Sequence, residues 1–181
     1  EVFDIMNSNH YLCFDGHKRK CPNFSENLKL FTMSIFSILG GKKTPKYPTD
    51  TIQDREDNDV KITFFKHASL SITVGERHIY TDPVGDYAEY AHLPKADVVL
   101  ISHSHYDHFD RAAVDDITSR HSVVICDKTT AEAFDGEAVV MTPGMQAKVE
   151  GGFLIEAVAA YNTTEGHTDF HPKEREDCGY V

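Results

Sequence analysis

The sequence lacks several motifs that would assign a chemistry at once. Its four cysteines are widely spaced and form no Cys-x-x-Cys pair, which excludes a zinc ribbon and a thioredoxin-like motif. It contains no glycine-rich phosphate loop and no serine in a glycine-flanked elbow, so neither a nucleotide site nor a serine hydrolase is indicated. Because no disulfide framework is suggested, we predict a reducing, cytoplasmic location.

Long apolar runs are absent as well. The mostly apolar stretch Leu28 to Leu39 is much shorter than the roughly 20 residues that a membrane-spanning helix needs. It also lies too deep in the chain for an ordinary signal peptide. We expect an amphipathic or buried helix there and no membrane span.

Positive charge is scarce. The 181 residues carry 18 Lys and Arg against 29 Asp and Glu, a net charge of −11. Such a balance argues against nucleic acid as a partner, since nucleic-acid-binding proteins usually present a basic patch. It does not exclude a phosphorylated small-molecule substrate, because a bound metal ion can supply local positive charge.

Histidine is dense in one place. The apolar run Ala96 to Ile101 leads into a loop that contains His103, His105, Asp107 and His108. Imidazole nitrogen and carboxylate oxygen are ligands that zinc and its neighbours prefer. This spacing cannot place all four side chains on one helix face, whereas alternation in an extended segment puts the first two histidines on the same side. The pattern therefore predicts a buried strand that ends in a metal-binding loop.

The chain divides by composition into two parts. Residues 1–59 carry polar clusters and no sustained periodicity, so we expect an N-terminal extension of little regular structure. Residues 60–181 alternate short strands with helices, which indicates layered α/β architecture. Expected strands are 60–65, 69–74, 78–82, 96–101, 122–127, 139–141, 147–149 and 153–158, and expected helices are 111–119 and 128–134.

The motif His-x-His-x-Asp-His at residues 103–108, with Asp82-Pro83 after an earlier strand, resembles the signature of the metallo-β-lactamase superfamily. His67-Ala68-Ser69 and His171-Pro172-Lys173 resemble a narrower branch of L-ascorbate-6-phosphate lactonase-like and phospholipase D-like hydrolases. The resemblance implies the N-terminal half of an αββα sandwich, with mixed sheets, outer helices and two divalent metal ions per complete site. Zinc is the first expectation, with Mn, Fe or Ni as alternatives.

The resemblance also implies roles for individual residues. His103, His105 and a later histidine would hold the first ion; His171 is preferred for that position and His167 is the alternative. Asp107 and His108 would begin the second site, and Asp107 would also act catalytically as a proton shuttle. Two further residues, Asp82 and His67, are expected to orient the ligating imidazoles, although a strand-end cap and a loop histidine are equally good readings of them.

One expected feature is missing from the sequence. The family's bridging aspartate and last histidine, with the second half of the sandwich, have no counterpart before the last residue, Val181. The expectation is therefore a domain whose C-terminal half is missing, completed by a continuation, a homo-oligomer or a complementing chain.

Two functions follow from these observations. The first is a metal-dependent hydrolase that uses a metal-activated hydroxide on a lactone, ester or phosphodiester. The alternative is a non-catalytic or incomplete metal-binding fragment that needs a partner chain to complete its site.

Overall fold

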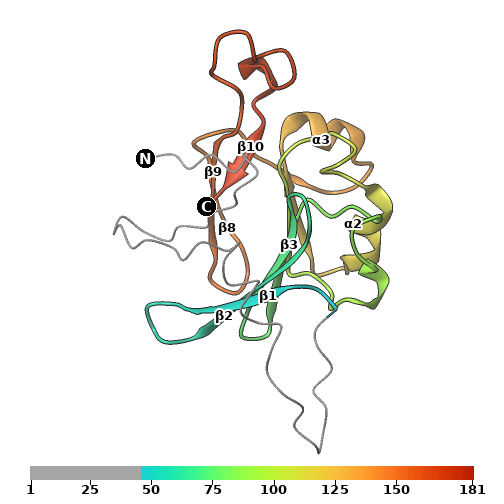
Figure 1. Cartoon of the computed structure of the whole chain (residues 1–181), viewed down its shortest axis with the longest axis vertical. Coiled ribbons are helices and arrows are strands. Elements are labelled where there is room, and N and C mark those ends of the chain that lie inside the picture. The colour runs from blue at the N-terminus through green and yellow to red at the C-terminus, as the bar shows by residue number, and fades with distance from the viewer. Residues whose placement is uncertain (1–45) are drawn as a thin grey trace, which may run out of the picture. The chain divides into compact units, whose positions relative to one another are not determined.

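The computed structural model describes residues 46–181 (Figure 1), so the expected helix within 28–39 lies outside the described residues. Ten strands, two α-helices and two short 3₁₀-helices make up this part of the chain. In order they are β1 Thr49–Gln53, β2 Asp59–Lys66, β3 Ser69–Val74, β4 Arg77–Thr81, η1 Tyr90–His92, β5 Val98–Ile101, α2 Arg111–Ile117, β6 Val123–Cys126, α3 Lys128–Ala133, β7 Val139–Val140, β8 Gln146–Lys148, β9 Leu154–Ala159, η2 Lys173–Arg175 and β10 Cys178–Tyr180.

Seven strands form the larger sheet in the order β1-β2-β3-β4-β5-β6-β7. The first four strands pair antiparallel, and tight turns connect β2 to β3 and β3 to β4. From β4 onward the pairs are parallel, and α2 and α3 provide two of the crossovers that parallel pairing requires. The sheet is therefore mixed, which confirms the predicted α/β class.

The larger sheet is buried on both faces by different partners. Along β5, Val99 and Ile101 belong to the cluster that includes buried residues of α2, while Val98 and Leu100 belong to a second cluster with residues of β9. Alternate side chains of a strand point to opposite faces, so helices cover one face and a second sheet covers the other. Figure 1 shows α2 and α3 on one side of the molecule and β8 to β10 on the other.

The second sheet contains three antiparallel strands in the order β10-β9-β8. Its buried residues, among them Ile155 and Ala157, pack against Ile79 and Ile125 of the larger sheet. Helix, sheet and sheet thus form three successive layers, as expected for half of an αββα sandwich. No helix among residues 46–181 is long and apolar enough to cross a bilayer.

The helices begin where the sequence indicates. Asp110 caps α2 by accepting a hydrogen bond from the Ala112 amide, and Asp127 caps α3 through the amides of Thr129 and Thr130. Strand β1 was missed, because it lies in the segment expected to be an extension. All five of its residues are exposed, so it has no apolar alternation, and its pairing with β2 holds it in the sheet.

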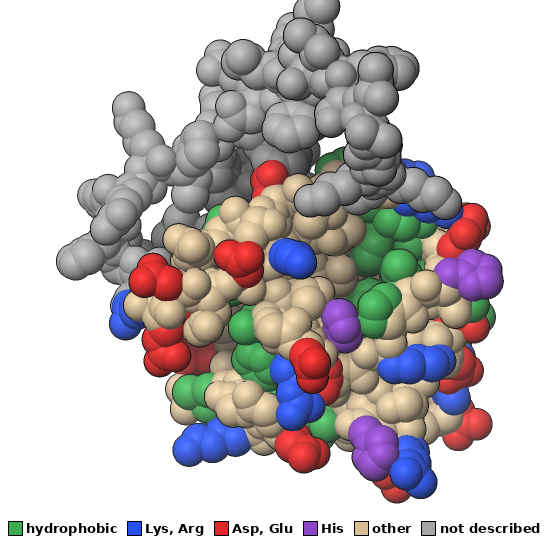
Figure 2. Space-filling model, turned by 90° about the horizontal axis from the view of Figure 1, so that it is seen from below, with side chains coloured by type: hydrophobic (Ala, Val, Ile, Leu, Met, Phe, Trp, Pro, Cys, Tyr) green, Lys and Arg blue, Asp and Glu red, His purple; other side chains and the backbone are tan. Residues whose placement is uncertain are grey.

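Acidic and basic side chains are interspersed on the face of the described residues shown in Figure 2, with histidines between them. The negative net charge is therefore not gathered into one patch on this face.

Candidate metal centre

The histidine-rich loop follows directly from β5. All four residues of that strand are buried, and residues 102–110 connect its carboxyl end to the capped start of α2. Binding sites of α/β sheets commonly lie beyond the carboxyl ends of parallel strands. The loop thus extends from a rigid, fully packed strand into the position where a site is expected.

The structure brings His103, His105 and His171 together. Each offers a ring nitrogen, and these nitrogens lie within 4.8 Å of one another. The ring centroids of His103 and His171 are 4.8 Å apart, and those of His105 and His171 are 5.0 Å apart. We call these three residues the first histidine group.

His171 reaches the group because β10 is attached to the end of β5. The Cys178 amide donates to the carbonyl of Ser102 at 3.1 Å, and the Tyr180 hydroxyl donates to the carbonyl of Ile101 at 2.9 Å. The loop that precedes β10 is thereby held against His103. His167 lies in the same loop but is exposed, and it is a member of neither ligand group among residues 46–181.

The hydrogen bonds of the first histidine group leave a lone pair on Nε2 in all three rings. His171 Nδ1 donates to Asp177 at 2.8 Å. His105 Nε2 accepts from the Arg175 guanidinium at 3.0 Å, so this nitrogen carries a lone pair. An Nε2 lone pair is the form in which an imidazole can ligate a cation while its other nitrogen is held by a partner.

His103 completes the same pattern. The hydroxyl of Ser102 lies 2.7 Å from an Asp82 carboxylate oxygen and 3.0 Å from His103 Nδ1. Since a carboxylate can only accept, the hydroxyl donates to Asp82 and accepts from Nδ1–H. His103 is 0% exposed, and its Nε2 has no hydrogen-bond partner among the described residues. A buried nitrogen without a partner is costly, and a metal ion would satisfy it.

A second group contains His67, Asp107 and His108, whose ligand atoms also lie within 4.8 Å of one another. The two Nε2 atoms are 3.1 Å apart, and His67 Nε2 is 3.4 Å from an Asp107 carboxylate oxygen. His67 occupies the turn between β2 and β3 at a φ of 55°, a conformation that is uncommon outside glycine. We call these three residues the second ligand group.

Asp82 lies behind both groups. It is 4% exposed and accepts hydrogen bonds from the Ser102 amide, the Ser102 hydroxyl and His108 Nδ1, each at 2.7 Å. This contact leaves His108 Nε2 facing His67. One carboxylate therefore orients His108 directly and His103 through the serine hydroxyl.

Comparisons with known proteins identify the family of the chain. The model of the family described as "Beta-lactamase superfamily domain" matches residues 61–181. The chain belongs to the metallo-β-lactamase superfamily. The second sheet and the ligand loops, β8 to β10 included, all fall within the matched residues.

Two relatives give the superfamily assignment its context. A UPF0173 metal-dependent hydrolase of Flavobacterium johnsoniae is 46% identical over 54 residues, which are 27% of this chain and 24% of that protein. A crystal structure from Parabacteroides distasonis, provisionally named a metal-dependent hydrolase, superposes with a TM-score of 0.70 and 35% identity. That match covers 75% of this chain and 60% of the other, so the chain spans less than two thirds of these relatives.

Sequence reasoning missed three contributors to the site: Ser102, Arg175 and Asp177. Ser102 could have been noticed from its position between a buried strand and the first histidine. The other two lie in a loop without periodicity, and no local pattern distinguishes them from neighbouring charged residues. Their contacts arise only when β10 docks against β5.

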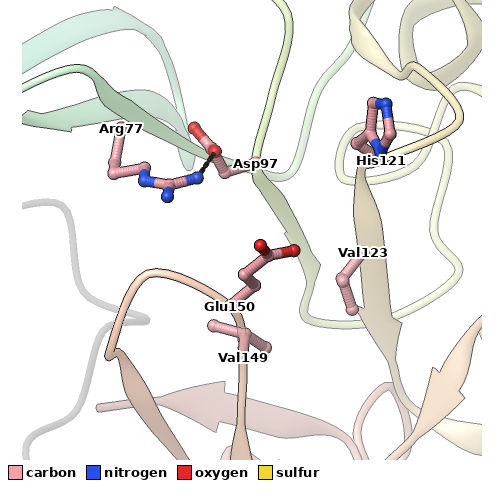
Figure 3. Close-up of a pocket in the computed structure, with 6 residues that line it drawn as sticks. All are labelled: Arg77, Asp97, His121, Val123, Val149 and Glu150. Carbon is pink, nitrogen blue, oxygen red and sulfur yellow. Dashed lines mark hydrogen bonds and ion pairs between the residues drawn. The ribbon is translucent and has the colours of Figure 1, made fainter.

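A surface pocket elsewhere is separate from this site (Figure 3). Arg77 and Asp97 lie on one side of it, paired at 2.6 Å, with Val149 and Glu150 on another. These residues lie at the amino ends of β4 and β5 and in the turn after β8, whereas the histidine loop follows the carboxyl end of β5. The pocket therefore adds nothing to the metal centre.

Two histidines of the first group, His103 and His105, resist protonation. Burial, followed by the neighbouring charges of His108, His105, His171 and Arg175, lowers the pKa of His103 from 6.5 to about 2. Burial and then the Arg175 charge lower the pKa of His105. Both rings are therefore ready to ligate a cation without first losing a proton.

This depressed pKa predicts how the stability of the metal-free protein depends on pH. Below pH 6.5 the unfolded chain protonates His103 while the folded chain does not, so the unfolding free energy is highest above pH 6.5 and falls on acidification toward pH 2. One such group removes about 2 kcal/mol between pH 7 and pH 5. Urea unfolding at several pH values measures it. His103→Gln should reduce the slope of unfolding free energy against pH by the equivalent of one proton. An unchanged slope would contradict the lowered pKa of His103.

Proposed function

We propose that this chain is a hydrolase whose nucleophile is a water molecule activated by metal ions at the two ligand groups. One observation carries the proposal. The imidazoles of His103, His105 and His171 come together, each with a lone pair on Nε2, beside the second ligand group. The names of the two relatives, both metal-dependent hydrolases, support the same reaction class. Lactones, esters and phosphodiesters are the substrates that we propose.

The residues present fit metal ions. For tetrahedral zinc with bonds of about 2.0–2.1 Å, ligand atoms lie roughly 3.4 Å apart. The second ligand group shows separations of 3.1 Å and 3.4 Å, and the first contains the buried, unpartnered Nε2 of His103. We propose two divalent ions per complete site, zinc in the first instance, with Mn, Fe or Ni compatible with the same ligands.

When bound, such an ion lowers the pKa of its water from 15.7 to about 7 and polarises the bond to be broken. The protein residues then have separate tasks. Asp82 fixes His108 and, through Ser102, His103. The Asp107 carboxylate, which lies at the edge of the second ligand group with its side chain 33% exposed, can accept a proton from the nucleophile and pass it to the leaving group.

His67 is assigned more than a supporting role in this proposal. Sequence reasoning placed it with Asp82 among residues that orient imidazoles. Its Nε2 lies as close to His108 Nε2 as two ligands of one ion do. We therefore propose that His67, Asp107 and His108 together hold the second ion.

The alternative is a metal-binding chain that does not turn over substrate on its own and needs a complementing chain, since the chain spans 60% of the solved relative. Two measurements on the 181-residue chain separate them: zinc content with molecular mass, and turnover of a panel of lactones, esters and phosphodiesters. Turnover that requires the ions supports the hydrolase. Bound metal with no turnover, whether the chain is a monomer or an oligomer, supports the alternative. We also propose a cytoplasmic location, with which the buried free thiols of Cys126 and Cys178 are compatible.

The choice between His171 and His167 has a direct test. His171→Ala removes one of three ligands and is expected to weaken zinc binding at the first histidine group at least about 100-fold, because even supporting contacts of a site are worth about 10- to 100-fold in affinity. His167→Ala, a substitution in the same loop, is the matched control and should change the zinc affinity less than twofold. Competition with a chromophoric chelator measures both. The reverse order would assign the ligand to His167.

A further inference from the structure

Arg175 is a cationic side chain that contacts a proposed ligand atom. It ends η2, and its Nη1 lies 3.0 Å from His105 Nε2. Its Nε donates to Asp177 at 3.1 Å, while its buried Nη2 has no hydrogen-bond partner in the described part of the chain. The guanidinium therefore binds Asp177 through Nε and contacts the first histidine group through Nη1.

Asp177 makes this orientation a fixed one. Its side chain is 0% exposed and uses its two oxygens on different partners, Arg175 through one and His171 Nδ1 through the other. The same carboxylate thus sets the positions of a proposed ligand and of the arginine. A guanidinium held at Nε presents its two terminal nitrogens as a planar fork.

Ligation of a cation changes the partner of Arg175. The lone pair of His105 Nε2 cannot both accept an N–H and ligate an ion. If His105 ligated an ion, Arg175 Nη1 would lose its acceptor. Nη1 and Nη2 would then both be donors without a hydrogen-bond partner. Two adjacent N–H groups without acceptors in a half-buried side chain are costly, and an oxyanion with two acceptor oxygens satisfies both.

The charges of the first histidine group point to the same ligand. Its three proposed ligands are imidazoles, which ligate a metal ion in their neutral form, and the charge of Asp177 is balanced by that of Arg175. The charge of a divalent ion would therefore remain uncompensated there. The second ligand group, in contrast, contains the carboxylate of Asp107 and adjoins that of Asp82. Although the chain as a whole is acidic, this side of the site favours an anion.

We propose that Arg175 is an oxyanion-binding residue that exchanges His105 for a phosphoryl or carboxylate group of the substrate once the site holds its metal. The inference rests on the proposed metal-dependent function and narrows it to substrates that carry such an anion close to the bond that is hydrolysed. Within the range of lactones, esters and phosphodiesters, it favours the anionic members over neutral ones.

The test is the binding of inorganic phosphate to the zinc-loaded 181-residue chain, measured by calorimetry, with acetate titrated in parallel. Hydrogen bonds to charged groups contribute about 1.5–3 kcal/mol, so Arg175→Gln should weaken phosphate binding about 10- to 100-fold while zinc content stays the same. Arg175→Lys, which keeps the charge but loses the fork, should fall between. Arg120→Gln, at an exposed arginine outside the site, is the matched control.

Turnover supplies a second measurement. For Arg175→Gln, KM should rise for bis(4-nitrophenyl) phosphate and stay the same for neutral 4-nitrophenyl acetate. Equal effects on both substrates, loss of zinc from the variant, or phosphate binding equal to wild type would each overturn the role of Arg175 while leaving the metal-dependent hydrolase intact. A wild-type chain that binds zinc but no phosphate or acetate would also overturn it. A chain that binds no zinc would remove both proposals, and the relative affinity for phosphate and acetate identifies the preferred anion.

Discussion

Replacement of His103 by alanine is expected to reduce the bound zinc from two ions to one and to lower hydrolysis at least about 10³-fold. This residue is the only wholly buried member of the first histidine group, and its Nε2 has no other partner among the described residues. Without the ion, water keeps a pKa of 15.7 in place of about 7, so the nucleophile is lost at neutral pH. Elemental analysis of the purified variant and its turnover rate measure both effects.

The matched control for this substitution is His92→Ala, which removes an exposed imidazole of η1 outside both ligand groups. It should retain two ions and full activity. If His103→Ala also retained two ions, the convergence of the three imidazoles would not be a metal site. The result would be equally damaging if metal were lost and turnover persisted.

Replacement of Asp82 by alanine is expected to lower the unfolding free energy of the metal-free protein by about 3–5 kcal/mol, because each donor left without its acceptor in a buried setting costs about 1–3 kcal/mol. Three donors, the amide and hydroxyl of the half-buried Ser102 and the Nδ1–H of the buried His108, would lose their common acceptor. Folded domains are stable by only about 5–15 kcal/mol. Urea denaturation followed by circular dichroism measures the loss.

Two comparisons refine the Asp82 experiment. Asp82→Asn keeps one acceptor oxygen and suits the residue's positive φ of 40°, so it should cost less than alanine. Asp115→Ala removes an exposed carboxylate paired with Arg111 and should change stability by less than about 1 kcal/mol. A loss for Asp82→Ala as small as that for Asp115→Ala would show that the carboxylate does not support the loop.

The fold could be predicted where the sequence alternates or runs apolar. Strands β3 and β5 and the caps of α2 and α3 have local causes, and the structure contains them within a residue or two of the expected positions. Strand β1 could not be predicted, because its exposed residues are held by pairing with β2 and carry no apolar pattern.

The candidate site divides in the same way. His103, His105, Asp107 and His108 lie in one short motif, so their proximity follows from chain geometry alone. The contact of His67 with that motif depends on the register of the β2–β3 hairpin, and those of Arg175 and Asp177 depend on how β10 docks. No local pattern in the sequence shows these contacts. For this reason the sequence alone predicts only a supporting role for His67.

The attachment of β10 to β5 has a mechanical consequence. His103 and His105 follow a strand of the larger sheet, while His171 precedes a strand of the smaller one. An ion shared among them would cross-link the two sheets and oppose their separation, so metal affinity and the docking of the last strand are thermodynamically coupled. Hydrogen exchange of the amides in β9 and β10 should therefore slow when zinc is added. Zinc would bind tightly only when the smaller sheet is docked on the larger one.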